Sequence, residues 1–173
     1  MSGFLQLYDD ALPHIYGYLV RRCTNPATAE DLTAETFMAA ATLVCNATST
    51  APATPDATPD LNIAWLMGTA RHKLIDHWRR TERRKEELAD LWDDLDRRPS
   101  VPDPNDEAIE VAAAHEVLAQ LAPQHRAVLT LRYLDDLPVG DVAATIGRTV
   151  HATEALLTRA KTAYRNYSGK DNR

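Results

Sequence analysis

The chain has few of the residues that build disulfide frameworks, membrane spans or β-sheets. Its 173 residues include only two cysteines and six glycines, with no CxxC pair, so neither a disulfide scaffold nor a cysteine metal site is expected. No apolar run is long enough to cross a bilayer, and the first residues do not read as a signal peptide, so we expect a cytoplasmic protein without membrane insertion. Alternating β patterns are nearly absent and alanine is abundant, which predicts an all-α fold.

Signatures of catalysis and of metal binding are also missing. The six histidines form no HExxH motif, and His72 and His77 are five residues apart, which does not place two ligands on one helical face. The sequence contains neither a phosphate-binding loop nor a nucleophile elbow. We therefore expect a protein that is not an enzyme and that holds no metal or cofactor.

Charge is strongly sorted along the chain, although the net charge is only −6. Seven bases lie between residues 71 and 85 beside two acids, and ten acids lie between 86 and 110 beside two bases. Apolar residues at three- and four-residue steps predict a helix over Leu61–Leu91 with one packed face and one cationic face. Such a face suits a phosphate backbone; the alternative is a solvated face on which Asp76 neutralises its neighbours.

The C-terminal part has the pattern of a helix-turn-helix. Val139–Ile146 carries apolar residues at i, i+3, i+4 and i+7, and Gly147 follows at the position where a left-handed C-cap favours glycine. Thr149 can cap a second helix over Val150–Tyr167, because its hydroxyl can accept a hydrogen bond from a free backbone N–H. Two packed helices of any bundle fit the same spacing, so this pattern alone leaves both alternatives open.

The remaining segments predict two helical domains. Further helices are expected over residues 4–20, 28–44, 109–122 and 123–134. The run Asn46–Asp60 is rich in Thr, Ala and Pro and is expected to form an open loop. Prolines within the acidic stretch indicate an extended linker. The prediction is a larger domain over 1–91 and a smaller one over 109–173, joined by an acidic linker over 92–108.

Four segments along the chain match motifs that occur together in one family. In order they are Ala29–Phe37 (AEDLTAETF), Trp65–Arg80 (WLMGTARHKLIDHWRR), Leu121–Arg126 (LAPQHR) and Asp141–Lys161 (DVA … RAK). They resemble the AED-L-T-Q-E-T-F, WL-x-x-I-A-R-N-x-x-I-D-x-x-R-R, L-P-x-x-x-R and E-I-A … R-A-R motifs of bacterial sigma factors of the extracytoplasmic-function (ECF) group, in the sigma-70 family. The resemblance covers nearly the whole chain, in order and at the expected spacing.

The resemblance implies a subunit that binds core RNA polymerase and directs promoter-specific transcription initiation. Its first domain would dock on the β′ clamp helices and hold the melted minus-ten element. Its second domain would bind the β flap and read the minus-thirty-five element in the major groove. A dedicated anti-sigma factor would be a further partner.

The same resemblance assigns roles to individual residues. Those implied in polymerase binding are Asp31, Leu32, Glu35 and Phe37. Those implied at the minus-ten element are Trp65, Arg71, His72, Lys73, Asp76, His77, Arg79 and Arg80. Those implied at the minus-thirty-five element are Arg148, Thr149, His151, Thr153, Glu154, Thr158, Arg159 and Lys161.

The sequence departs from the family pattern at four of its motif positions. Ala34 replaces the usual Gln, and His72 stands where Asn is common. Glu154 and Leu156 stand where Lys and Arg are common, and a Glu can accept a hydrogen bond from cytosine N4 but repels phosphate. The alternative function, from another class, is a stand-alone helix-turn-helix repressor, which would need a dimerisation surface or a phosphoacceptor domain.

Overall fold

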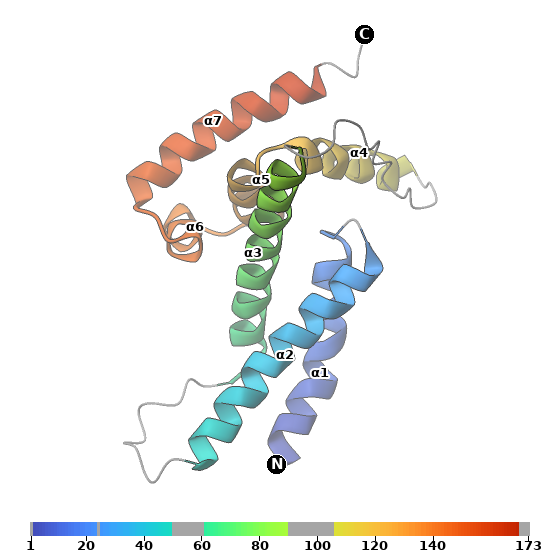
Figure 1. Ribbon diagram of the computed structural model, residues 1–173, viewed down its shortest axis with the longest axis vertical. Helices are drawn as coiled ribbons and strands as arrows, with labels where there is room; N and C mark the ends of the chain where they lie inside the picture. Colours follow the sequence, from blue (N-terminus) through green and yellow to red (C-terminus); the bar gives the residue numbers. More distant parts are fainter. Residues whose placement is uncertain (1, 24, 50–60, 90–105, 170–173) are drawn as a thin grey trace. The chain divides into compact units, whose positions relative to one another are not determined.

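All the regular structure that the computed structural model describes is helical, which confirms the predicted all-α class (Figure 1). The described residues are 2–23, 25–49, 61–89 and 106–169. The chain divides into two compact units, Met1–Leu74 and Ile75–Arg173. The division falls inside one long helix, so that helix contributes residues to both units.

The first unit is built from α1 (Ser2–Val20), α2 (Pro26–Ser49) and the first half of α3 (Ile63–Ala89). α1 and α2 lie side by side and antiparallel (Figure 1). Asparagine side chains precede α2 and α3 and bind their free N–H groups. Asn25 Oδ1 accepts from the Ala27 N–H, and Asn62 Oδ1 accepts from the Trp65 N–H, each at 2.9 Å.

The core of the first unit mixes large aliphatic side chains with alanine. Its buried apolar residues are Ala11, Ile15, Leu19, Ala29, Leu32, Phe37, Ala40, Leu66, Ala70 and Leu74. Alanines at the helix contacts allow the backbones to approach closely, while the aliphatic side chains fill the space between the helices. Burial of this set follows the helical period that the sequence predicted.

Two predicted boundaries were wrong. The expected loop over Asn46–Asp60 begins too early, because α2 continues through Ser49; no proline interrupts the chain before Pro52, so nothing stops the helix there. The helix α4 begins at Asp106, inside the expected linker, where acidic residues are favourable in a first helical turn. Residues 50–60 and 90–105 lie outside the described residues, and the domain boundaries at 91 and 109 stay predictions.

The second unit joins the C-terminal half of α3 to five further helical segments. They are α4 (Asp106–Gln120), α5 (Pro123–Leu129), the π-helical turn η1 (Thr130–Leu134), α6 (Val139–Ile146) and α7 (Val150–Ser168). The segment predicted as one helix over 123–134 is helical throughout, but its end is π-helical. There the Asp135 N–H donates to the Thr130 carbonyl at 3.0 Å, a bond that spans five residues.

Val128, Leu131, Val142 and Leu156 are each at most 1% exposed and form the centre of this second core. They come from α5, η1, α6 and α7, so the short helices are held by one shared apolar interior. Because α6 has only two turns, its stability depends on this packing rather than on its own helix propensity.

Candidate functional site

The α6–turn–α7 segment has the geometry of a helix-turn-helix. Gly147 ends α6 in the left-handed region, with φ 69° and ψ 41°, as its sequence position predicted. The Arg148 N–H donates to the Ala143 carbonyl at 2.9 Å, which closes the turn. Thr149 then caps α7, and its Oγ1 accepts from the Ala152 N–H at 3.2 Å. The turn therefore fixes where the first residues of α7 point.

Most of the residues implied at the minus-thirty-five element lie on the surface of this segment. The exposed ones are Arg148, Thr149, His151, Glu154, Thr158, Arg159 and Lys161. Thr153 is an error of the prediction, because its side chain is fully buried and its hydroxyl donates to the Thr149 carbonyl at 2.9 Å. Leu156, which stands where the family motif has a cationic residue, is 1% exposed and therefore belongs to the core.

Two residues that the sequence did not single out adjoin this surface. His125 on α5 is half-buried, and burial, followed by the charge of Arg159, lowers its pKa below the usual 6.5. The imidazole is therefore neutral at neutral pH. Tyr133 in η1 is 52% exposed, and Lys161 Nζ lies 5.2 Å from its ring centroid, a cation–π contact. Tyr133 lies in the π-helical turn, so its exposure beside a cation could not be predicted from an α-helical period alone.

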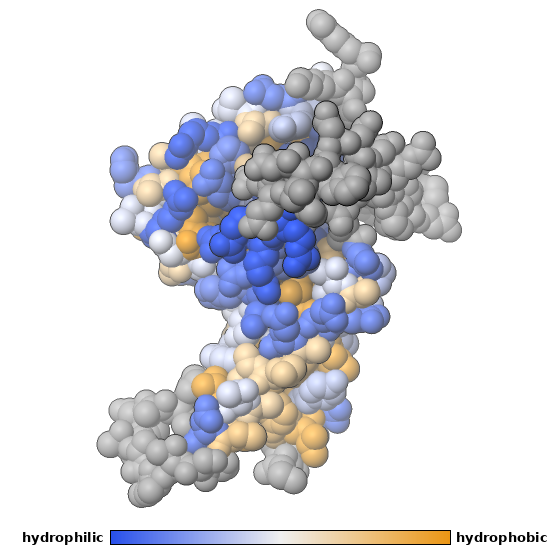
Figure 2. Space-filling model, in the orientation of Figure 1, coloured by the Kyte–Doolittle hydropathy of each residue, from blue (hydrophilic) through white to orange (hydrophobic). Residues whose placement is uncertain are grey.

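The cationic helix face predicted from the sequence is present on α3. Figure 2 shows hydrophilic side chains gathered over its C-terminal part. Of the residues implied at the minus-ten element, the exposed ones are His72, Asp76, Arg79 and Arg80, and the half-buried ones are Trp65, Arg71, Lys73 and His77. Arg79 Nη1 lies 3.5 Å from Asp76 Oδ1, so Asp76 neutralises one neighbour, as the alternative interpretation expected, while Arg80 stays exposed beside it.

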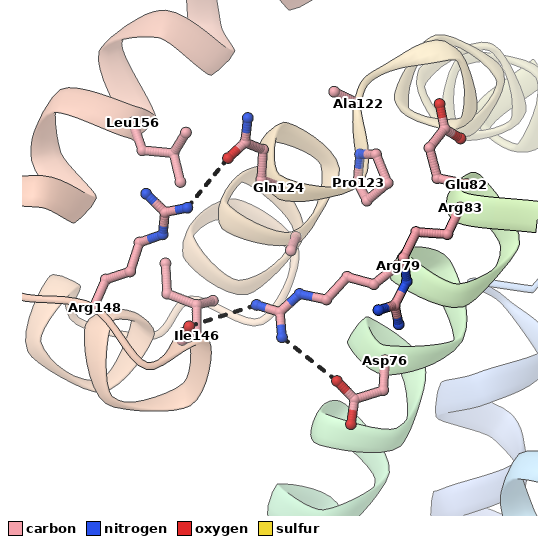
Figure 3. Close-up of a pocket in the computed structure, with 11 residues that line it drawn as sticks. Asp76, Arg79, Glu82, Arg83, Ala122, Pro123, Gln124, Ile146, Arg148 and Leu156 are labelled. Carbon is pink, nitrogen blue, oxygen red and sulfur yellow. Dashed lines mark hydrogen bonds and ion pairs between the residues drawn. The ribbon is translucent and has the colours of Figure 1, made fainter. Parts of the chain in front are cut away.

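Inside the second unit, the end of α3 lines a cavity of about 590 Å³ (Figure 3). Arg79 reaches the Ile146 carbonyl at 3.5 Å, and Arg148 donates to Gln124 at 3.3 Å. Arg126 lies 4.2 Å above the ring of Trp78, which is 7% exposed. The cavity lining itself combines three guanidinium groups, two carboxylates and apolar side chains, so its charge is mixed.

Two apolar residues of α2 that were implied in polymerase binding do not lie on its exposed face. Leu32 and Phe37 are 2% and 6% exposed, and Phe37 lies 4.6 Å from the Tyr8 ring centroid, so both are core residues. Asp31 and Glu35 do lie on the surface, and Met38 beside them is 68% exposed. The sequence reasoning missed Met38, although its spacing from Asp31 and Glu35, at i+7 and i+3, places all three on one helical face.

An ion pair joins two of the predicted sets within the first unit. Lys73 Nζ, implied at the minus-ten element, lies 3.2 Å from Glu35 Oε2, implied in polymerase binding. The two side chains are 34% and 40% exposed, so the pair lies at the rim of the α2–α3 contact rather than in the core. Among the described residues, no group of His, Cys, Asp and Glu is arranged to hold a metal ion.

Comparison with known proteins gives the same assignment as the motifs. The family model of sigma-70 region 4 matches residues 112–163, which include α6, the turn and most of α7. The ECF RNA polymerase sigma factor BldN of Streptomyces coelicolor is 32% identical over 163 residues, which are 92% of this chain and 58% of that protein. This chain is similar in sequence to ECF sigma factors, and its C-terminal part matches region 4 of the sigma-70 family. The ECF RNA polymerase sigma factor SigL of Mycobacterium tuberculosis is 28% identical over 82% of this chain and 75% of that protein.

A solved structure shares the fold of this chain. The complex of the sigma factor RpoE with the anti-sigma factor NepR from Bartonella quintana matches all of both chains, with a TM-score of 0.56 and 18% identity. The chain spans 58% of the length of BldN, so its relatives include a longer protein. Within the described ranges, no helix has the length and apolarity needed to cross a bilayer.

Proposed function

We propose that this chain binds core RNA polymerase in the cytoplasm and directs promoter-specific transcription initiation. The observation that carries the proposal is that one chain has both a helix-turn-helix and a separate helical surface with two carboxylates around an exposed methionine. The similarity to a sigma factor extends over 92% of the chain, so it includes both features. The protein would act by binding, while the polymerase performs the chemistry.

The helix-turn-helix would read the minus-thirty-five element. The first turns of α7 present His151, Glu154 and Thr158 on the surface, at the spacing of one helical face. In the major groove, each good base contact is worth about 1–3 kcal/mol of discrimination. Arg148 and Arg159 would contact phosphates, which would position the helix without reading sequence. Glu154 is exposed, so it is available to accept a hydrogen bond from a cytosine N4 group.

The cationic face of α3 would hold the melted minus-ten element. Arg79 and Arg80 are exposed and are suited to the phosphates of a single strand. Trp65 and His72 offer ring surfaces on which an unstacked base can lie, and such stacking contributes about 1–3 kcal/mol per base. This stacking free energy is of the same order as the few kcal/mol that extruding a base costs.

The α2 face would dock on the β′ clamp helices of the polymerase. Its carboxylates, Asp31 and Glu35, suit basic partner residues, and Met38 would supply an apolar contact in place of the buried Phe37. Methionine adapts to irregular partner surfaces because it is unbranched and polarisable. The second unit would contact the β flap, and an anti-sigma factor would compete for these surfaces.

The alternative is a stand-alone helix-turn-helix repressor. A repressor needs no surface for the polymerase, so it leaves the exposed carboxylates and methionine of α2 without a role. The similarity to sigma factors outside the helix-turn-helix also favours the sigma-factor function. The two functions differ in one observable, since a sigma factor activates core polymerase and a repressor occludes DNA.

A pull-down with core polymerase tests the docking surface. Changing Asp31 and Glu35 together to Lys should abolish core binding, because four units of charge change on the face that meets basic partners. The matched control changes Asp9 and Asp10 of α1 to Lys, which gives the same charge change on exposed residues of another helix. Helical circular dichroism should stay unchanged in both variants. Equal binding by both variants would remove the α2 face from the interface.

A further inference from the structure

The Glu35–Lys73 ion pair lies between two surfaces that the proposed function assigns to different partners. Glu35 belongs to the α2 face with Asp31 and Met38, and Lys73 begins the cationic stripe of α3 that continues to Arg80. Their charged atoms are 3.2 Å apart although the residues are 38 positions apart in the sequence. Each charge is therefore held by the other before either external partner arrives.

Under the proposed function, each side chain of the pair can also bind an external partner, and that binding competes with the ion pair. A basic residue of the polymerase that binds the Glu35 carboxylate leaves Lys73 without its acidic partner. A DNA phosphate that binds the Lys73 ammonium leaves Glu35 without its basic partner. We propose that this ion pair couples polymerase docking to promoter binding, so that occupation of one side chain frees the other. This inference rests on the proposed function, because it needs both partners.

The size of the coupling follows from the exposure of the pair. Side chains that are 34% and 40% exposed are well solvated, and ion pairs of this kind are weak enough to be exchanged for a partner. Freeing one charge from the other raises its affinity for a partner by about two- to sixfold. Coupling between two binding sites is reciprocal, so polymerase must favour DNA by the same factor that DNA favours polymerase.

The polymerase arm of the test removes the lysine charge. Lys73→Met keeps the aliphatic stem and frees Glu35, so it should tighten binding to purified core polymerase by about two- to sixfold. A simple loss of DNA contact would leave this affinity unchanged. Arg21→Met is the matched control, because it removes one positive charge from an exposed position in the same unit. Lys73→Arg preserves the pair and should bind core polymerase as the wild type does.

The DNA arm removes the carboxylate charge. Glu35→Gln frees Lys73, so the isolated protein should bind a single-stranded thymidine oligonucleotide about two- to sixfold more tightly. The slope of log affinity against log salt should also steepen by about 0.7, the value for one added phosphate contact on a single strand. Glu30→Gln is the matched control, since it removes one negative charge from an exposed position of the same helix.

The outcomes separate the coupling from the proposed function. If the wild-type chain does not bind core polymerase, the proposed function fails and the coupling fails with it. If the wild type binds but Lys73→Met matches Arg21→Met, the coupling alone is overturned. It is also overturned if Glu35→Gln and Glu30→Gln give the same DNA affinity and the same salt slope. Thermal melting of every variant establishes that the compared proteins are folded.

Discussion

Replacing Gly147 with alanine tests the turn that joins α6 to α7. Gly147 has φ 69°, and a Cβ added there meets no heavy atom within 4 Å, so the substitution creates backbone strain without a steric clash. The left-handed conformation costs a non-glycine residue about 1–2 kcal/mol. Restriction of the unfolded chain by alanine offsets about 0.4–1 kcal/mol of this cost. We therefore expect Gly147→Ala to destabilise the protein by about 1 kcal/mol.

The same substitution seven residues earlier provides an internal control of opposite sign. Gly140 lies in the first turn of α6 and is exposed, and a Cβ added there also meets no heavy atom within 4 Å. Because its φ is not positive, Gly140→Ala should stabilise by about 0.5–1 kcal/mol. Urea unfolding measures both changes, and 1 kcal/mol corresponds to about 4–8 °C in melting temperature for a domain of this size. A neutral or stabilising effect of Gly147→Ala would refute the left-handed turn.

Three further changes test the cap, the core and the titration of the second unit. Thr149→Ala should cost about 1 kcal/mol in urea unfolding through loss of the α7 cap, and a cost near zero would contradict the cap. Leu156→Ala should cost about 2–5 kcal/mol, whereas Glu154→Ala on the exposed face should stay within about 0.5 kcal/mol; similar costs would contradict the assigned orientation of α7. The pKa of His125 is lowered in the folded state, so the unfolded chain binds protons more readily. The free energy of unfolding should therefore be unaffected by this histidine above pH 6.5 and should fall as the pH drops from 6.5 through the folded-state pKa. Melting temperatures across this pH range should show that loss in the wild type and a smaller one in His125→Gln; identical profiles would count against the shift.

Local sequence signals predicted the helix-turn-helix closely. The bounds of α6, Val139–Ile146, follow from four apolar positions and the glycine after them, and the structure has the same bounds. Thr149 caps α7 as expected, and α7 begins at Val150. These features depend on interactions within a few residues, namely a C-cap, an N-cap and one apolar stripe. Such interactions can be read from one sequence without knowing the tertiary contacts.

Surface assignments depend on packing and were less predictable. Leu32, Phe37 and Thr153 lie inside motifs that the family resemblance implied in binding, yet all three are buried. Motif membership does not state which side of a helix is covered by its neighbours. Met38 was missed for the converse reason, because an apolar residue in a helix is expected to face the core. The Glu35–Lys73 contact joins residues on different helices, and a helical period contains no information about such pairs.

Run-off transcription with purified core polymerase over a fragmented genomic library tests whether this chain acts as a sigma factor. Transcripts that start at a discrete set of sites should form only when this chain is added. The doubly substituted Asp31→Lys, Glu35→Lys chain should give none of these transcripts. Absence of new transcripts with the wild-type chain, together with tight and specific binding of the isolated protein to duplex DNA, would exclude the sigma-factor function and favour a repressor.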